Sequence, residues 1–137
     1  MGLFDFLKSS KKERIKSITN TIGKFTFIEV DAIKNYKGLV NSKINNGIEI
    51  LFPVNENEIS NYQTEYYKNI ESNWTPILNQ LKKQYPNISI ENYKVKSILI
   101  PDKNHQYYDM DAEIVLQNES NIISLILKDL IIEEIIY

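Results

Sequence analysis

The residues best suited to chemistry in this chain are three carboxylates that alternate along one predicted strand, Asp109, Asp111 and Glu113. Carboxylates that converge on one point hold hard divalent cations, and positioned carboxylates act as general acids or bases. Alternation along a strand, however, spreads three side chains over roughly 13 Å, which is too wide for a single ion. We therefore expect a solvated acidic face that meets a basic protein partner, and no bound metal or cofactor.

Other residue types offer little support for catalysis. The single histidine, His105, lies in a predicted loop, and a lone catalytic histidine needs an orienting partner that the sequence does not reveal. The chain contains no glycine-rich phosphate loop, no nucleophile elbow and no HExxH or paired-cysteine pattern. The sequence thus predicts a protein that is not an enzyme.

A run of aromatic residues occurs at helical spacing in the middle of the chain. Such rings stack on nucleic-acid bases when they line a basic groove. The neighbouring charges here are acidic, at Glu58, Glu65 and Glu71. We expect these aromatic side chains to pack in the core instead: Tyr62, Tyr66, Tyr67 and Trp74.

Composition places the chain among ordinary globular proteins. Its 137 residues suit one domain, and 42% hydrophobic with 25% charged residues is a typical balance. A formal charge of -2 argues against nonspecific binding to nucleic acid. The absence of cysteine excludes disulfides and suits a reducing compartment, so we expect a cytoplasmic location.

Hydrophobic periodicity predicts an α+β fold. Apolar residues recur at every second position over 24–54 and 93–137, which indicates strands, and every three to four positions over 56–85, which indicates a helix. We expect a mostly antiparallel sheet of six or seven strands in β-β-β-α-β-β-β-β order. Pro76 interrupts the helical stripe, so either one kinked helix or two nearly collinear helices should pack on one face of the sheet. Asn55 and Glu58 form a plausible capping pair at its start.

Two hairpins can be assigned a register from the apolar pattern. A three-residue loop at 45–47 keeps one face apolar by pairing Ile44 with Ile48, Ser42 with Ile50 and Val40 with Phe52. A loop at 102–104 pairs Val95 with Ala112, Leu99 with Tyr108, Lys96 with Asp111 and Lys94 with Glu113. In this register one face of the second hairpin is apolar and the other is charged.

The two ends of the chain differ in character. Residues 1–20 combine an apolar cluster (Leu3, Phe4, Phe6, Leu7) with a basic stretch, and we expect a short helix there that packs on the domain. The same ingredients favour an amphipathic segment at a membrane surface, which is the alternative. Residues 122–128 and 130–137 have no clear polar face, which leaves both helix and strand open. Their many β-branched residues favour two strands joined by a tight reversal at Lys128 and Asp129.

The element order resembles that of small bacterial α+β families that include immunity proteins of polymorphic toxin systems. The features that carry this resemblance are FTFIEV at 25–30, YKGLV at 36–40 followed by NNG at 45–47, and the helix leading into YKVKSILI at 93–100. The resemblance implies a non-catalytic protein that neutralises a cognate toxin through an acidic surface. The alternative function is a structural or membrane-peripheral protein attached through residues 1–16.

Overall fold

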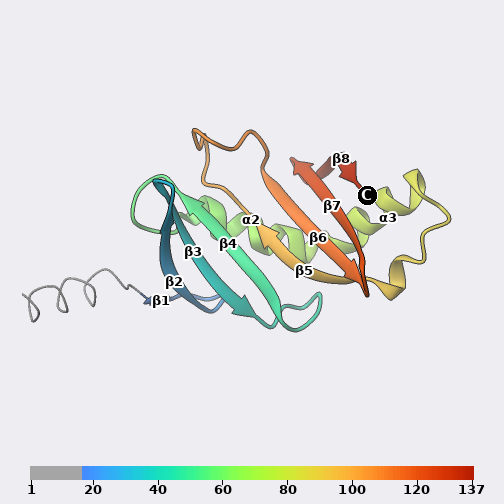
Figure 1. The fold of residues 1–137 in the computed structure, drawn as a ribbon, viewed down its shortest axis with the longest axis horizontal. Coiled ribbons are helices and arrows are strands. Elements are labelled where there is room, and N and C mark those ends of the chain that lie inside the picture. The colour runs from blue at the N-terminus through green and yellow to red at the C-terminus, as the bar shows by residue number, and fades with distance from the viewer. Residues whose placement is uncertain (1–16) are drawn as a thin grey trace, which may run out of the picture.

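The chain is built on one eight-stranded sheet in which the strands lie in sequence order, with β1 at one edge and β8 at the other (Figure 1). The structure is a computed structural model and describes residues 17–137. The strands are β1 (Ser17–Thr19), β2 (Lys24–Val30), β3 (Ile33–Val40), β4 (Ile48–Val54), β5 (Lys94–Leu99), β6 (Ala112–Asn118), β7 (Asn121–Lys128) and β8 (Ile131–Ile136). The α+β class and the mostly antiparallel sheet are confirmed.

The predicted strand count was too low. Strands occur in all seven predicted regions, but β1 lies within the segment 1–20 that was expected to be helical and basic, and it adds an eighth strand through pairing with β2. Its three residues are too few to produce a periodic signal. The rest of that segment, residues 1–16, together with the predicted helix and membrane attachment, lies outside the described residues.

Within residues 17–137, all helical structure lies between β4 and β5. It comprises α2 (Asn61–Ser72), α3 (Trp74–Gln84) and the short 3₁₀ helix η1 (Ile90–Asn92). Every neighbouring pair of strands is antiparallel except β4 and β5, which are parallel. This exception follows from the helices, because a chain that crosses over a sheet through helices returns to the same end and runs in the same direction.

The helical segment consists of two helices rather than one. The break falls at Asn73, and Pro76 sits in the first turn of α3, where its missing N–H removes no hydrogen bond within the helix. The cap of α2 is Ser60, whose hydroxyl accepts a hydrogen bond from the Gln63 backbone N–H. The predicted capping pair, Asn55 and Glu58, was therefore wrong, because the cap lies five residues after Asn55.

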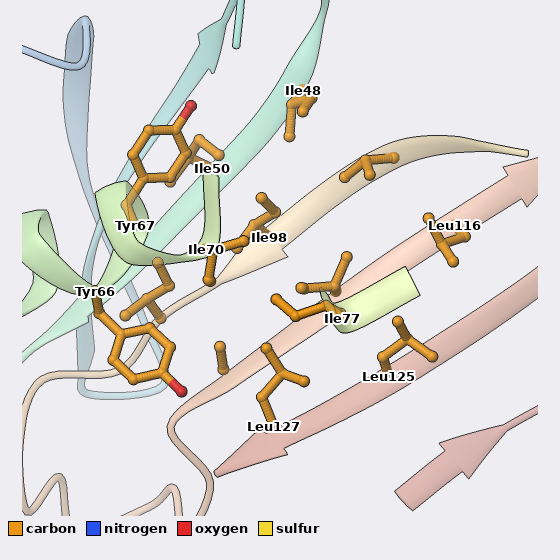
Figure 2. Close-up of a cluster of buried hydrophobic side chains, with 14 of the residues drawn as sticks. Ile48, Ile50, Tyr66, Tyr67, Ile70, Ile77, Ile98, Leu116, Leu125 and Leu127 are labelled. Carbon is orange, nitrogen blue, oxygen red and sulfur yellow. The ribbon is translucent and has the colours of Figure 1, made fainter. Parts of the chain in front are cut away.

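The core lies between the helices and one face of the sheet. In Figure 2, Ile70 of α2 and Ile77 of α3 point toward aliphatic side chains from β4, β5, β6 and β7. The side chains at the centre of this layer are fully or almost fully buried: Ile48, Ile50, Ile70, Ile77, Leu81, Ile98, Ile114, Leu116, Leu125 and Leu127. This burial provides the main favourable term in folding.

The register predicted for the first hairpin was wrong. β3 and β4 pair Val40 with Ile48 and Gly38 with Ile50, so the connecting loop is longer than three residues. Its polar side chains have partners elsewhere. The Asn45 amide donates to the Val95 carbonyl and accepts from the Val95 N–H, in place of a strand neighbour, and Ser42 donates to the Glu71 carboxylate of α2. These hydrogen bonds to α2 and β5 stabilise the longer loop.

The register predicted for the second hairpin was also wrong. Lys94 faces Gln117, Leu99 faces Glu113, and a bulge between Val95 and Ser97 shifts the alternation. The residues from Asp102 to Asp111 do not continue the strands but form a long loop, which rises at the end of the sheet where β7 terminates (Figure 1). The expected pairing of Lys96 with Asp111 is therefore absent.

Within residues 17–137, the helices cover one face of the sheet and leave the other, here called the uncovered face, without a helix (Figure 1). The uncovered face carries half-buried aliphatic side chains at its centre, including Leu51, Leu99, Val115 and Ile126, with Glu113 among them. It is thus less charged than the sequence pattern predicted. In the part of the chain that the structure describes, no helix combines the length and apolar character required to cross a membrane.

Candidate functional site

A cleft of about 580 Å³ opens where α2, the β5–β6 loop and the β7–β8 turn meet. We call it the tyrosine–aspartate cleft. Tyr62 and Tyr66 of α2 form one wall, and the remaining lining residues come from the two connections. Its lining is Tyr62, Tyr66, Asp102, Lys103, Asn104, His105, Tyr108, Asp109, Met110, Asp111, Lys128 and Asp129.

Asp111 is the centre of a hydrogen-bond network in this cleft. Its carboxylate accepts a short bond of 2.7 Å from the Asp129 backbone N–H and longer bonds of 3.5 Å from the hydroxyls of Tyr62 and Tyr66. The Tyr66 hydroxyl also accepts from the Leu130 N–H at 3.1 Å. In Figure 2 this hydroxyl points toward the end of β7. The network therefore ties α2 to the β7–β8 turn.

That turn needs such support because its backbone is strained. Asp129 and Leu130 have φ values of 52° and 63°, in the left-handed region that residues other than glycine seldom adopt. Left-handed geometry at both central residues gives the turn type that matches the twist of a two-residue hairpin. Asp111 and Tyr66 bind both of its central N–H groups and hold it in place.

Asp102 anchors the opposite side of the cleft. Its carboxylate accepts from the Ser60 hydroxyl and from the Lys103 N–H, both at 2.8 Å. Ser60 is the N-cap of α2, and Gln63 lies three positions later in its first turn. The Gln63 side chain has no exposed surface and donates to the carbonyls of Pro53 in β4 and Ile100 just beyond β5. The start of α2 is thus fixed to both parallel strands and to the loop that forms the cleft.

Two of the cleft's carboxylates remain free. The hydrogen bonds of residues 17–137 leave Asp109 and Asp129 without a donor to their side chains, and both residues are exposed. Lys103 and Lys128 also line the cleft, but the ion pairs among the described residues, Lys37–Glu49 and Lys68–Glu65, involve neither of them. Carboxylates outnumber lysines in the lining, so the cleft is negatively charged.

His105 is a mostly buried ionisable residue of the cleft, with 8% of its surface accessible. Its Nδ1 accepts from the Tyr107 N–H at 3.2 Å, and its ring lies edge-on to Tyr108. Burial lowers the pKa of His105, while the nearby Asp102 carboxylate acts in the opposite direction. The ring is therefore neutral at pH 7 and carries its proton on Nε2, a donor with no acceptor among residues 17–137.

Tyr62 and Tyr66 are protonated donors in the cleft. Burial, followed by the charge of Asp111, raises the pKa of Tyr62 to about 12. Burial also raises the pKa of Tyr66, although the hydrogen bond from Leu130 opposes this effect. Their hydroxyls therefore keep their protons throughout the physiological range and bond to Asp111 as neutral groups.

The structure separates the three acids that the sequence grouped together. Asp109 and Asp111 both line the cleft, with Asp109 free and Asp111 occupied by internal donors. Glu113 lies on the uncovered face of the sheet, between Leu99 and Ile126. The β5–β6 loop explains the separation, because the strand begins only at Ala112 and strict alternation does not extend back to Asp109.

Sequence reasoning did not identify the other lining residues as a group. Tyr62 and Tyr66 had been expected to pack in the core, and Tyr66 is indeed buried, yet its hydroxyl reaches the cleft. Asp102 and Asp129 belong to two predicted turns. In the predicted hairpin order these turns fall at the same end of the sheet, and this is the signal that could have brought the residues together.

The arrangement is suited to binding a cation. Carboxylates attract the charge, and tyrosine rings offer faces that favour organic cations. Within residues 17–137, no three acidic or histidine side chains are placed so that they could hold a metal ion. Comparison with protein-family models, with curated protein sequences and with solved structures found no significant match.

Proposed function

We propose that this chain is a small, non-catalytic protein-interaction module that binds a basic partner at the tyrosine–aspartate cleft. The observation that carries the proposal is the pair of free, exposed carboxylates, Asp109 and Asp129, in a cleft whose other two carboxylates, Asp102 and Asp111, are held by internal bonds. A preformed site of this kind loses little conformational entropy on binding.

The partner that best fits the sequence resemblance is a toxin domain. An immunity protein acts by occupying a basic surface of its toxin, and charge complementarity accelerates such association. An acidic cleft with a rigid frame is suited to this role. Of the three acids expected to contact a partner, Glu113 lies outside the cleft, on the uncovered face, so it serves as a control for the proposal.

The proposal is tested with the product of the neighbouring open reading frame as the binding partner, by isothermal titration calorimetry. We expect Asp109→Lys and Asp129→Lys each to weaken binding by tenfold or more, on the order of 1.4 kcal/mol. Glu113→Lys, on the uncovered face, should leave the affinity unchanged. No binding of a toxin-like product would exclude the immunity role, and weakening by Glu113→Lys alone would place the interface on the other face.

A further inference from the structure

We infer that the tyrosine–aspartate cleft is a receptor for a single arginine side chain presented on an extended stretch of polypeptide. This inference rests on the proposed function and names the chemistry that the same site recognises. Three features of the cleft support it: the position of the free carboxylates, the tyrosine wall and the unoccupied donor of His105.

The free charges select a cation. Asp109 and Asp129 approach the cleft from two different connections, the β5–β6 loop and the β7–β8 turn, and neither carboxylate has a donor within residues 17–137. Asp102 and Asp111 in the same lining are half-buried and already accept internal hydrogen bonds, so they add negative charge to the cleft and are less open to a ligand than Asp109 and Asp129. A ligand with several N–H donors fits these two open acceptors better than a point charge.

The wall of the cleft selects a planar cation. Tyr62 and Tyr66 lie with ring centroids 6.0 Å apart and rings inclined by 47°, and Tyr108 contributes a third ring. A guanidinium group stacks on aromatic faces and loses little hydration in doing so, whereas an ammonium group is compact and strongly hydrated. The cleft volume of about 580 Å³ leaves room for a long side chain and for the backbone that carries it.

The third feature points to a ligand with a carbonyl group. His105 has only 8% of its surface exposed, and its Nδ1 accepts a hydrogen bond from the Tyr107 N–H. Its Nε2–H has no acceptor among the described residues, and the ring lines the cleft. Among the described residues, Nε2 is not one of the buried side-chain atoms that lack a partner, so it is open to water, and a ligand carbonyl that replaces this water keeps the donor paired. A peptide carbonyl next to an arginine side chain supplies that acceptor.

The test is a titration of the ¹⁵N-labelled full chain, followed by NMR, with N-acetyl-arginine N-methylamide as the probe. A single residue of this size is expected to bind weakly, with a Kd on the order of millimolar. Amide signals of residues 102–111 and 128–130 should shift and saturate. The citrulline analogue, which has the same shape but no charge, should bind at least about tenfold more weakly, and the lysine analogue should bind more weakly than arginine.

Variants separate the contributions. Asp109→Asn combined with Asp129→Asn should weaken arginine binding about tenfold, while Glu134→Gln on the uncovered face should have no effect. His105→Phe should weaken the arginine probe but not agmatine, which has the guanidinium and lacks the carbonyl.

Equal binding of citrulline, equal binding of lysine, or shifts confined to other regions would overturn the inference. The inference also fails if the arginine probe does not bind at all while Asp109→Lys abolishes binding of the protein partner. That result would leave the proposed function intact.

Discussion

Two aspartates that are two positions apart in the sequence have different roles in the structure. The Asp111 carboxylate binds the Asp129 N–H and two tyrosine hydroxyls, whereas the Asp109 carboxylate has no donor among residues 17–137. The first therefore stabilises the fold and the second is available to a ligand. Removing charge at the two positions should have separable effects.

Asp111→Asn should lower the free energy of unfolding by about 1–3 kcal/mol, because it weakens a hydrogen bond that supports a strained turn. Asp109→Asn should change stability by no more than about 0.5 kcal/mol, as expected for a surface substitution. Urea denaturation of both variants provides the comparison. Equal stability of the two proteins would mean that the Asp111 network does not hold the turn.

His105 should make stability depend on pH. Burial lowers its pKa in the folded state, so the unfolded chain binds a proton more readily. Its contribution to stability is therefore complete above about pH 6.5, the value for an unperturbed histidine, and decreases as the pH falls below it.

We expect the free energy of unfolding to fall between pH 7.5 and pH 5.5, and the His105→Gln variant to lack that component of the fall. Chemical denaturation across this range provides the measurement. Identical pH profiles for the two proteins would contradict the assignment of a neutral, buried imidazole.

At the scale of elements, the start of α2 depends on Gln63. The side chain is fully buried, and it donates to two carbonyls at the ends of β4 and β5 while accepting from the Ser60 N–H. Gln63→Leu keeps the size of the side chain but leaves these groups unpaired, so it should cost about 3 kcal/mol. Gln84→Leu, at the exposed end of α3, is the matched control and should be nearly neutral.

Thermal and urea unfolding of the two glutamine variants decide the point. Gln63 accepts from the N–H of Ser60, and the Ser60 hydroxyl donates to Asp102, so the destabilised variant should show altered NMR shifts in the cleft as well. A Gln63→Leu protein as stable as the original would contradict its role as a link between strands.

Two turns allow a paired test of backbone strain. Ala32 has a φ of 66° in the β2–β3 turn, and glycine at this position should stabilise the protein by about 0.5–1 kcal/mol. Gly47 has a φ of 71°, and an added Cβ would meet no atom within 4 Å. Gly47→Ala should therefore destabilise by about 1 kcal/mol through strain alone. Effects of the same sign in the two variants, measured by thermal unfolding, would contradict this explanation.

The type of each long element could be predicted from periodicity, but the connections could not. Alternation in β4 and the helical spacing of Ile70, Ile77 and Leu81 reflect burial on one side of each element. Such one-sided burial produces a periodic pattern within a short stretch of sequence. The register of a hairpin depends on where its loop side chains find partners. Asn45 bonds to Val95, fifty positions away, and no local pattern contains that information.

The same limit applies to the cleft. Its residues come from α2 and from two connections that are distant in sequence, and their meeting requires the complete sheet order. Alternation grouped Asp109, Asp111 and Glu113 because it treated residues 108–117 as one strand. The acidic character of the region was thus predicted from sequence, whereas the partners of each acid became apparent only in the structure.

At the scale of the whole molecule, one face of the sheet supports both the core and the candidate site. The helices bury the apolar face and, at their start, form the wall of the cleft, so the core and the candidate site share α2 (Figures 1 and 2). A site attached to such a frame is expected to change little on binding. The charges at its mouth should then act mainly on the rate and salt dependence of association.

The central claim is that the free charges of the cleft attract the partner, and the salt dependence of binding tests it most directly. The measurement is the Kd for the neighbouring gene product at low and high sodium chloride, for the original protein and for the Asp109→Asn, Asp129→Asn double variant. We predict that the original protein binds more weakly as salt increases, and that the variant binds more weakly throughout with a flatter salt dependence. The same Kd and the same salt dependence for both proteins would contradict the account.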